Sequence, residues 1–378
     1  MKCNLLNSVV ALALGALAAY PFAAARAEDN ALSASADGAA SSANGTISAP
    51  PPAPPPVPIG ILVDNNLPQG RFVLSITPVF ANYSGLLIGT RGVSNEFVVS
   101  TVPFFLKPSQ KVRIVPQDIA VDIQGVRLRY GVTNDFEVIL DTGWVEKALD
   151  TRIFKGTAGT TTLADQYPRT SSIVDTILTG VYRIYQDDIQ RIQISLGLSF
   201  PLGTDDATYN NFLGPKGTRS NIRAFYGMEL GTGTFDILPG VIYAGYLGPW
   251  SWGLSYRARL PLDYNPLGYK YGNLHEFNGW VGYTWTPGLT TTFRVSGTTQ
   301  GHIDGFDPLI NGPAVPSNPL FYGGQKVELF GGGSIDGKLI GIDNAVILVE
   351  AGAPVYQNLN GPQLKKDWQA AARFAFKF

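Results

Sequence analysis

Cysteine is almost absent from this chain of 378 residues, and its scarcity excludes several classes of site. Cys3 is the single cysteine, and it precedes the cleavage site predicted below, so the mature chain has none. A disulfide framework and a cysteine-based metal site are therefore excluded. The chain also lacks an excess of positive charge, with 28 basic and 29 acidic residues. Nothing in this balance calls for a nucleic-acid partner.

Motifs for catalysis and for cofactor binding are missing as well. There is no G-x-S-x-G elbow, and no glycine-rich phosphate loop lies between a strand and a helix. The two histidines, His275 and His302, both fall near predicted external loops. A site that joins His302 and Asp304 to a serine would need a geometry that the sequence does not supply. We therefore expect no enzymatic activity, no cofactor and no bound metal.

The N-terminus carries the features of a secretory signal. Lys2 precedes an apolar run from Leu5 to Ala19, and Ala25-Arg26-Ala27 forms an A-x-A cleavage site. The run is too short to be a spanning helix. The pattern predicts a signal peptide over residues 1–27 with cleavage near Ala27.

A segment rich in alanine, serine and proline follows the signal. It covers residues 28–66 and includes the run APPPAPPPVP. Such a composition buries too little apolar surface to order itself, and a proline run is a stiff, extended spacer. We predict a disordered periplasmic tail over 28–66. The alternative is that this segment dips into the domain that follows and acts as a plug.

The last fourteen residues show the organising pattern of the chain, in which every second side chain is apolar. Polar residues at 367, 369, 373 and 377 separate the apolar ones, which are Trp368, Ala370, Ala372, Phe374, Phe376 and Phe378. Similar alternation recurs upstream, and no amphipathic helix is available to cover the apolar faces. A sheet closed on itself in a bilayer hides both its edges and its apolar face. The rival interpretation is an edge strand of a soluble sandwich.

We therefore predict that residues 67–378 form an all-β, transmembrane, antiparallel β-barrel in the outer membrane of a Gram-negative bacterium. Its mean hydropathy of +0.07 fits, because outward apolar residues are averaged with inward polar ones. The expected partners are outer-membrane lipid, a small-molecule solute and the barrel-assembly machinery, which would engage the last strand ending at Phe378.

Alternating connection lengths predict about 12 strands. Tight turns at 133–135, 187–188, 248–249, 286–288 and 336–337 alternate with longer segments, and bacterial barrels place short turns on the periplasmic side. This parity assigns 220–231 to an external loop, and 357–365 forms another. Fourteen strands, with 97–106 also spanning, is the alternative.

Charged residues in the strands indicate which face lines the interior. A charge on the lipid face costs roughly 2–4 kcal/mol at mid-depth, so the charged face of each strand is expected to face the lumen. In 118–131 a bulge at Gly125 would bring Asp122 and Gln124 to the same side as the arginines. The candidate lumen-lining residues are Arg127, Arg129, Glu137, Asp141, Asp175, Arg183, Arg191, Arg257, Arg259, Glu276, Arg294, Lys326, Glu328 and Arg373. The candidate external-loop residues are His302, Asp304, Asp307, Asn360 and Gln363.

Several segments resemble one family of outer-membrane proteins. LRYGVTNDFEVIL (128–140), SLGLSFPLGTDD (195–206), GHIDGFDP (301–308), FYGGQKVEL (321–329) and above all EAGAPVYQNLNGPQLKKDW (350–368) are similar to the phenol-degradation (MetA-pathway) family. The likeness covers about 118–378 and leaves out the proline-rich segment. It implies a transporter-like outer-membrane barrel that passes small compounds, aromatic or hydrophobic ones among them. The family name reflects gene context, so it does not give the substrate.

Two functions remain open at this point. The first is an outer-membrane channel or transporter that passes small solutes by passive or facilitated diffusion through a lumen lined by charges of both signs. The second is a structural or adhesive barrel whose paired charges occlude the lumen. A barrel of about 12 strands is wider than small barrels filled by side chains and narrower than open porins, so its width does not decide between the two functions.

Overall fold

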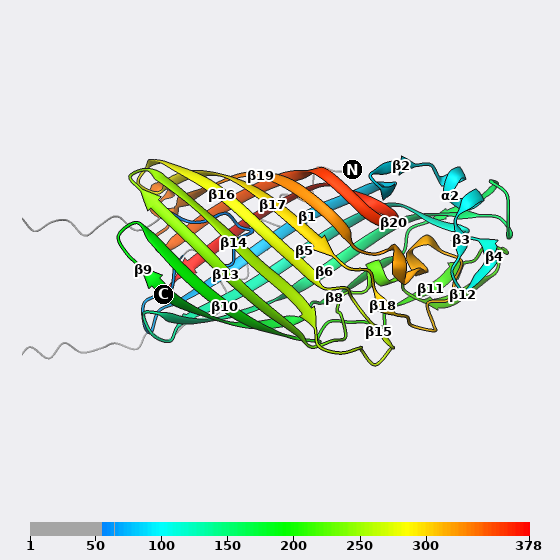
Figure 1. The fold of residues 1–378 in the computed structure, drawn as a ribbon, viewed down its shortest axis with the longest axis horizontal. Coiled ribbons are helices and arrows are strands. Elements are labelled where there is room, and N and C mark those ends of the chain that lie inside the picture. Colours follow the sequence, from blue (N-terminus) through cyan, green and yellow to red (C-terminus); the bar gives the residue numbers. More distant parts are fainter. Residues whose placement is uncertain (1–54, 64) are drawn as a thin grey trace, which may run out of the picture. The chain divides into compact units, whose positions relative to one another are not determined.

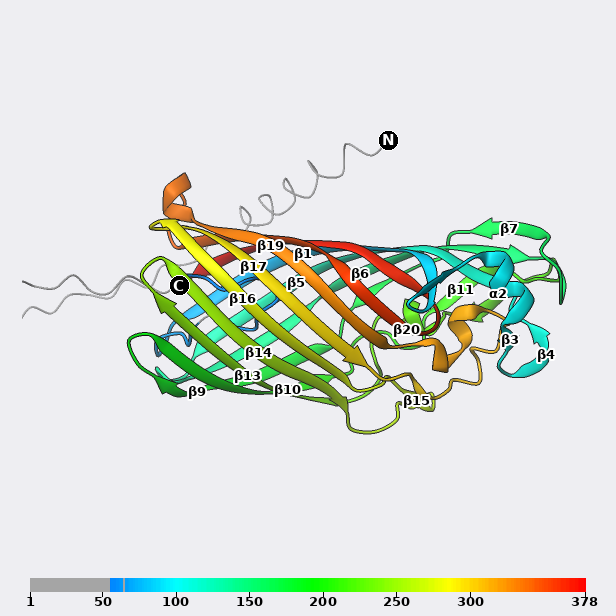
Figure 2. The same ribbon diagram turned by 45° about the horizontal axis from the view of Figure 1, so that its top comes forward.

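A computed structural model describes residues 55–63 and 65–378 (Figures 1 and 2). The predicted signal peptide and the tail up to residue 54 lie outside the described residues. The wall is one closed antiparallel sheet in which β1 pairs with both β5 and β20. Its strands are β1 (Phe72–Gly89), β5 (Ile114–Gly131), β6 (Phe136–Phe154), β9 (Thr176–Gln186), β10 (Gln190–Phe200), β13 (Asp236–Leu247), β14 (Trp250–Pro261), β16 (Leu274–Thr286), β17 (Leu289–Gln300), β19 (Gly324–Asp336) and β20 (Ala345–Lys377).

The longest of these elements, β20, crosses the wall twice. Residues 346–359 pair with β19, whereas 359–377 pair with β1. The two legs also bond to each other, because the Gln357 amide bonds both main-chain groups of Lys366 at 2.9 Å and Lys377 N donates to Asn344 O at 2.8 Å. The other ten elements cross once, so the wall has twelve crossings. The predicted all-β barrel of about 12 strands is confirmed.

One alternative and one prediction about the loops are wrong. Residues 97–106 do not span in a fourteen-stranded barrel, because they contribute to the short helix α2 (Asn95–Thr101) and to β3 (Pro103–Phe104), which pairs with β4 (Lys107–Lys111). Residues 357–365 are not a loop, since they continue the strand through the reversal of β20. Residues 220–231 do lie outside the wall, where β12 (Arg219–Arg223) pairs with β11 (Thr208–Leu213).

The two ends of the barrel differ, as the connection lengths predict. One end, which we call the turn end, carries the tight turns and the C-terminus (left in Figure 1). The other, the loop end, carries the long connections (right in Figure 1). Their short strands are β2 (Arg91–Val93), β7 (Thr162–Gln166), β8 (Arg169–Ile173), β15 (Tyr269–Lys270) and β18 (Asp304–Gly305). No helix in the described part of the chain is long and apolar enough to cross a membrane.

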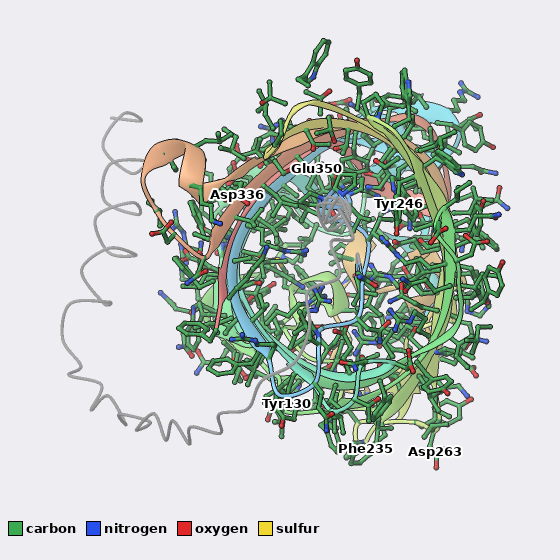
Figure 3. All side chains as sticks on the ribbon, turned by 90° about the vertical axis from the view of Figure 1, so that its left-hand side faces the viewer. Tyr130, Phe235, Tyr246, Asp263, Asp336 and Glu350 are labelled. Atoms are coloured by element: carbon green, nitrogen blue, oxygen red, sulfur yellow. The ribbon has the colours of Figure 1, made fainter. Side chains whose placement is uncertain are left out.

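Side chains alternate between the inside and the outside of the ring. Viewed along the barrel, Glu350 and Tyr246 lie within the ring, and Tyr130 and Phe235 lie outside it (Figure 3). Leu254 and Leu196 on the outer face are each 63% exposed, which suits a surface that meets hydrocarbon. At the turn end the rings of Phe72 and Phe378 stack with centroids 4.7 Å apart.

The predicted bulge at Gly125 is absent. β5 pairs with β1 without any register shift from Asp118 to Tyr130, so Asp122 and Gln124 stay on the outward face with Val126 and Leu128. Asp122 lies opposite Glu146, in the half of the β5–β6 hairpin nearer the loop end. Charged outward residues are inexpensive beyond the hydrocarbon band, so no bulge is needed to hide them.

Candidate functional site

A stretch of chain before the first strand occupies the barrel interior. This stretch, the N-terminal segment, comprises residues 55–63 and 65–68. Ile61 and Val63 are 1% and 2% exposed, and with Val57 they pack against side chains of the wall. Those wall residues are Ile139, Val181, Ile242, Ala244 and Trp280. The described part of the region predicted as a spacer thus follows the alternative, in which the segment enters the barrel (Figure 3).

Arginines of the wall hold the main chain of the N-terminal segment. Three of the predicted lumen-lining residues donate to its carbonyl oxygens. The bonds run from Arg127 Nη1 to Leu62 O (2.7 Å), from Arg129 Nη2 to Asn65 O (2.5 Å) and from Arg373 Nη2 to Ile59 O (3.0 Å). Two of these arginines are themselves fixed by carboxylates, Arg127 by Asp141 at 2.6 Å and Arg129 by Glu137 at 3.0 Å. The wall therefore binds backbone groups of the segment as well as its apolar side chains.

The end of the segment nearest β1 is held by amide groups. Asn66 Nδ2 donates to the carbonyl oxygens of Asp135 (3.1 Å) and Val181 (3.3 Å). Gln193 Nε2 donates to Asn66 Oδ1 at 2.7 Å, and Leu67 N donates to Glu137 Oε2 at 3.0 Å. Asn66 and Gln193 are both buried. These polar contacts satisfy main-chain groups that would otherwise be buried without partners.

Arg294 is the most enclosed arginine of the interior ion pairs. It forms a bidentate pair with Glu350, with bonds of 2.6 and 3.1 Å, and Nη1 donates to Asn278 Oδ1 at 2.7 Å. Its guanidinium lies 4.0 Å from the centroid of the Phe330 ring. A Cβ atom on Gly60 would collide with this guanidinium. Glycine at residue 60 therefore gives the segment its close approach to Arg294.

The remaining predicted lumen-lining residues also pair or lie beside the interior. Arg257 bonds Glu276 at 3.0 Å, and Glu328 bonds Lys366 at 2.6 Å. Lys326 is two residues from Glu328 in β19, on the same face. Arg191 is buried with its guanidinium 5.5 Å from the Tyr246 ring centroid. Arg183 pairs with Asp135 at the turn end.

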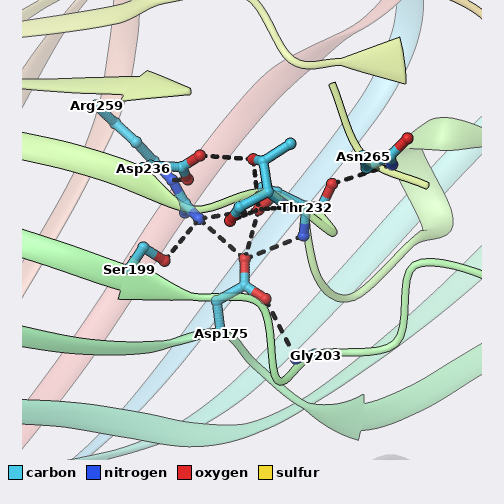
Figure 4. Close-up of polar contacts among 8 residues, drawn as sticks. Asp175, Ser199, Gly203, Thr232, Asp236, Arg259 and Asn265 are labelled. Carbon is cyan, nitrogen blue, oxygen red and sulfur yellow. Dashed lines mark hydrogen bonds and ion pairs between the residues drawn. The ribbon is translucent and has the colours of Figure 1, made fainter. Parts of the chain in front are cut away.

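A polar network at the loop end joins the wall to two loops (Figure 4). Arg259 bonds Asp175 at 2.9 Å and also pairs with Asp236. Asp175 further accepts from Gly203 N (3.2 Å) and Thr232 N (3.0 Å). One arginine thus holds two buried carboxylates, and the carboxylate of Asp175 fixes the loops that follow β10 and precede β13.

Sequence reasoning missed two kinds of interior residue. Asp236 pairs with Arg259 of the neighbouring strand β14, so cross-strand pairing could have found it. Lys366 reaches Glu328 past the first leg of β20, so cross-strand pairing does not reveal it. The apolar interior residues Ile139, Val181 and Trp280 share the face of charged residues in their strands. A search for charged residues does not detect them. Each of them does lie an even number of positions from Glu137, Arg183 or Glu276 in the same strand, and this spacing assigns it to the inner face.

The long connections fold into a cap with its own aromatic core at the loop end. Tyr226, Tyr269 and Phe225 are almost fully buried there, and Tyr226 packs edge-on against Tyr269 and Tyr322. The cap is therefore a packed structure and not a set of separate loops.

The predicted external-loop residues lie at the loop end in separate contacts. Asp307 is buried and pairs with Arg223 at 3.1 Å, and Asp304 accepts from the Tyr264 hydroxyl at 2.6 Å. His302 Nδ1 bonds Ile303 O at 2.9 Å. Asn360 and Gln363, placed in β20, donate to Tyr322 O (2.8 Å) and Gly323 O (2.9 Å). No group of three acidic, histidine or cysteine residues within the described ranges could hold a metal ion.

Glu229 is a buried carboxyl of the cap. Ala207 N donates to its Oε2 at 3.1 Å, and its Oε1 has no hydrogen-bond partner in the structure. Burial raises the pKa of Glu229 to about 8, although the Ala207 amide and the charge of Arg223 act in the opposite direction.

We expect the cap to loosen as pH rises. The pKa of Glu229 in the fold lies above its ordinary value of 4.5, so between about pH 4.5 and 8 the folded state keeps a proton that the unfolded state has lost. The stabilisation is complete below 4.5 and is lost as pH passes 8. Hydrogen exchange of 224–231, corrected for its intrinsic rate, should be at least about tenfold faster at pH 9 than at pH 6. Glu229→Gln should remove this dependence and Asp206→Asn, at an exposed position, should keep it; equal dependence in both variants would contradict the assignment.

Comparisons with known proteins agree with the architecture. No family model matches the sequence, and no curated protein matches it. Among solved structures, an outer-membrane channel from Pseudomonas putida F1 aligns with a TM-score of 0.52 and 13% identity, over 83% of this chain and 97% of that chain. The toluene transporter TodX of P. putida aligns with a TM-score of 0.42 and 10% identity, over 82% and 91% of the two chains. The first likeness shows the fold of an outer-membrane β-barrel, and the second is too distant to carry an argument.

Proposed function

We propose that this chain is an outer-membrane channel that passes small solutes by diffusion, and that the N-terminal segment has to move for passage to occur. The observation that carries the proposal is the nature of what fills the interior. Around the turn half of the barrel the space is taken by a stretch of chain and not by side chains of the wall alone. Hydrogen bonds and apolar contacts hold that stretch, so it is able to leave without breaking the sheet.

Two further points support this proposal. The barrel shares its fold with a solved outer-membrane channel. The sequence segments over 118–378 resemble the phenol-degradation (MetA-pathway) family, whose members are described as transporters or channel-like barrels. Aromatic or hydrophobic compounds are therefore candidate solutes, and the apolar interior around Trp280 and Ile242 offers them contact area.

The second candidate function, a structural or adhesive barrel, has its own supporting observation. The described interior is occupied, and most of its carboxylates are engaged in ion pairs. If the N-terminal segment never leaves, the barrel is a rigid support for the cap at the loop end.

Swelling of proteoliposomes separates the two. Liposomes with the purified full chain should swell in an iso-osmotic solution of a small neutral sugar, while protein-free liposomes should not. A variant lacking residues 55–66 should swell faster, since nothing then occupies the turn half. If neither protein supports swelling, the structural barrel is the better description.

A further inference from the structure

A groove lies in the outer face of the wall, across β13, β14, β16, β17 and β19. Its volume is about 600 Å³, and apolar side chains form most of its surface. Leu254 and Phe277 line it and are 63% and 55% exposed. Register partners share one face of a sheet, so Leu254 on the outer face places its neighbours Tyr243 and Gly279 outward as well. The groove therefore opens toward the membrane and not toward the interior.

Two glycines create the hollow. Gly279 lies beside Leu254 in one row of the sheet, and Gly297 lies beside Phe277 in the next row toward the loop end. A Cβ atom on Gly297 would meet nothing within 4 Å. Glycine inside a strand often marks a bulge or a place where another molecule approaches closely. The ladders of β17 with β16 and β19 have no register shift at these positions, and neither glycine has a positive φ, so the backbone itself does not require glycine there.

Hydrocarbon is the surrounding that this groove meets. It is continuous with the apolar outer face, where Ile194 and Val241 of the neighbouring strands β10 and β13 are 45% and 38% exposed. An acyl chain that lies in a groove contacts protein on two sides, whereas a chain on a convex wall contacts it on one. The additional dispersion contacts favour the chain in the groove over the chains around it.

A row of polar side chains borders the groove on the side of the loop end. His275, Thr299 and Gln325 are register partners on β16, β17 and β19, so they lie side by side on the outer face. His275 Nδ1 bonds the hydroxyl of Tyr256 at 2.9 Å, and Tyr256 lines the groove. Hydrogen-bonding groups next to an apolar hollow match an amphiphile that has a polar head and a hydrocarbon tail.

Aromatic side chains mark the opposite boundary of the membrane band. Tyr283 and Trp285 lie on the same outward face of β16 near the turn end, with ring centroids 4.8 Å apart. Tyrosine and tryptophan gather where a membrane meets water. The groove thus lies between this girdle and the row of His275, on the side of the long connections, which in bacterial barrels is the external side.

We propose that the groove is a lipid-binding site. It takes an acyl chain of a lipid of the external leaflet, and the polar head of that lipid lies over the row of His275, Thr299 and Gln325. The site is on the outside of the wall, so it does not depend on whether the interior conducts.

Native mass spectrometry of the protein extracted from outer membranes in a mild detergent tests the groove. Under conditions that strip loosely held lipid, the barrel should keep a single lipid. Gly297→Leu fills the hollow and should lower the lipid-carrying fraction several-fold. Gly331→Leu is the matched control, because Gly331 also faces outward, opposite Phe293, and has nothing within 4 Å of an added Cβ, but it lies outside the groove.

The mobility of unheated samples in gels shows that each variant is folded. Equal retention of lipid by the folded Gly297→Leu and Gly331→Leu variants would overturn the proposal. So would a folded full chain that carries detergent only. Swelling of proteoliposomes should be the same for Gly297→Leu and for the full chain, which keeps this test separate from that of the channel.

The polar row is tested by a double variant, Thr299→Val with Gln325→Leu. It leaves the groove intact and removes two hydrogen-bonding side chains, so retention of the lipid should fall. Thr291→Val makes an equal change on the outward face of β17 nearer the turn end and should have no effect. The mass of the retained molecule identifies its source. Undiminished retention by the double variant, or a retained lipid that belongs to the periplasmic leaflet, would refute the assignment to an external-leaflet lipid.

Discussion

Gly60→Val should raise the ionic conductance of the barrel on the order of tenfold, which is the step from a filled to an open interior. The reason is steric. Any Cβ at residue 60 collides with the guanidinium of Arg294, and that guanidinium is fixed by Glu350, Asn278 and the Phe330 ring. Because the neighbour has three contacts to lose, the N-terminal segment is the part that yields. Single-channel recording in planar bilayers measures the change.

Two matched variants make this result interpretable. Gly92→Val adds the same bulk at an exposed position in β2, where an added Cβ meets nothing within 4 Å, and should leave the conductance unchanged. Deletion of residues 55–66 sets the conductance of the unoccupied barrel, which Gly60→Val should approach. If the deletion variant conducts and Gly60→Val does not, Arg294 is more mobile than its contacts indicate and the steric explanation is wrong.

The second large effect concerns stability. Arg294→Met leaves Glu350 buried without its partner, and breaking a buried pair in this way costs about 3–5 kcal/mol. The two side chains are only 5% and 4% exposed, so solvent cannot compensate. We expect the midpoint of urea unfolding in detergent micelles, followed by tryptophan fluorescence, to fall sharply.

The double variant Arg294→Met, Glu350→Leu is the informative control. Removing both charges also removes the desolvation penalty, so most of the lost stability should return. Arg257→Met offers a comparison at a more accessible pair, where Arg257 is 47% exposed and the loss should be much smaller. A double variant as unstable as the single one would show that Arg294 stabilises the barrel through Phe330 and Asn278 instead of through the ion pair.

Much of the fold could be predicted from the sequence, because a barrel wall imposes a two-residue period on every strand. The alternation from Trp368 to Phe378 predicts the last leg of β20, and the connection lengths predict twelve crossings. The prediction of a bulge at Gly125 was wrong because it assumed that every charge on a strand lies within the bilayer. Strands such as β5 extend past the hydrocarbon, and there an outward charge carries little cost.

The site was harder to predict than the fold. Charged residues such as Arg127 and Arg294 could be assigned to one face by parity, but their partners depend on which strands are neighbours. The apolar alternation of Val57, Ile59, Ile61 and Val63 was readable beside the proline run, yet composition alone favoured a spacer. The bonds from Arg127, Arg129 and Arg373 to its carbonyl groups, together with its apolar contacts, place this stretch inside the barrel.

The contact between the first and last strands has a consequence for the order of assembly. β1 meets the second leg of β20, and Phe378 N donates to Phe72 O at 2.9 Å. The circle therefore stays open until the final residue has been delivered, so sealing is a late event with a long sequence separation. Residues 55–68 directly precede the first strand and are present throughout. In this order of assembly the N-terminal segment already adjoins β1 when the sheet closes, so it does not have to thread through a finished ring.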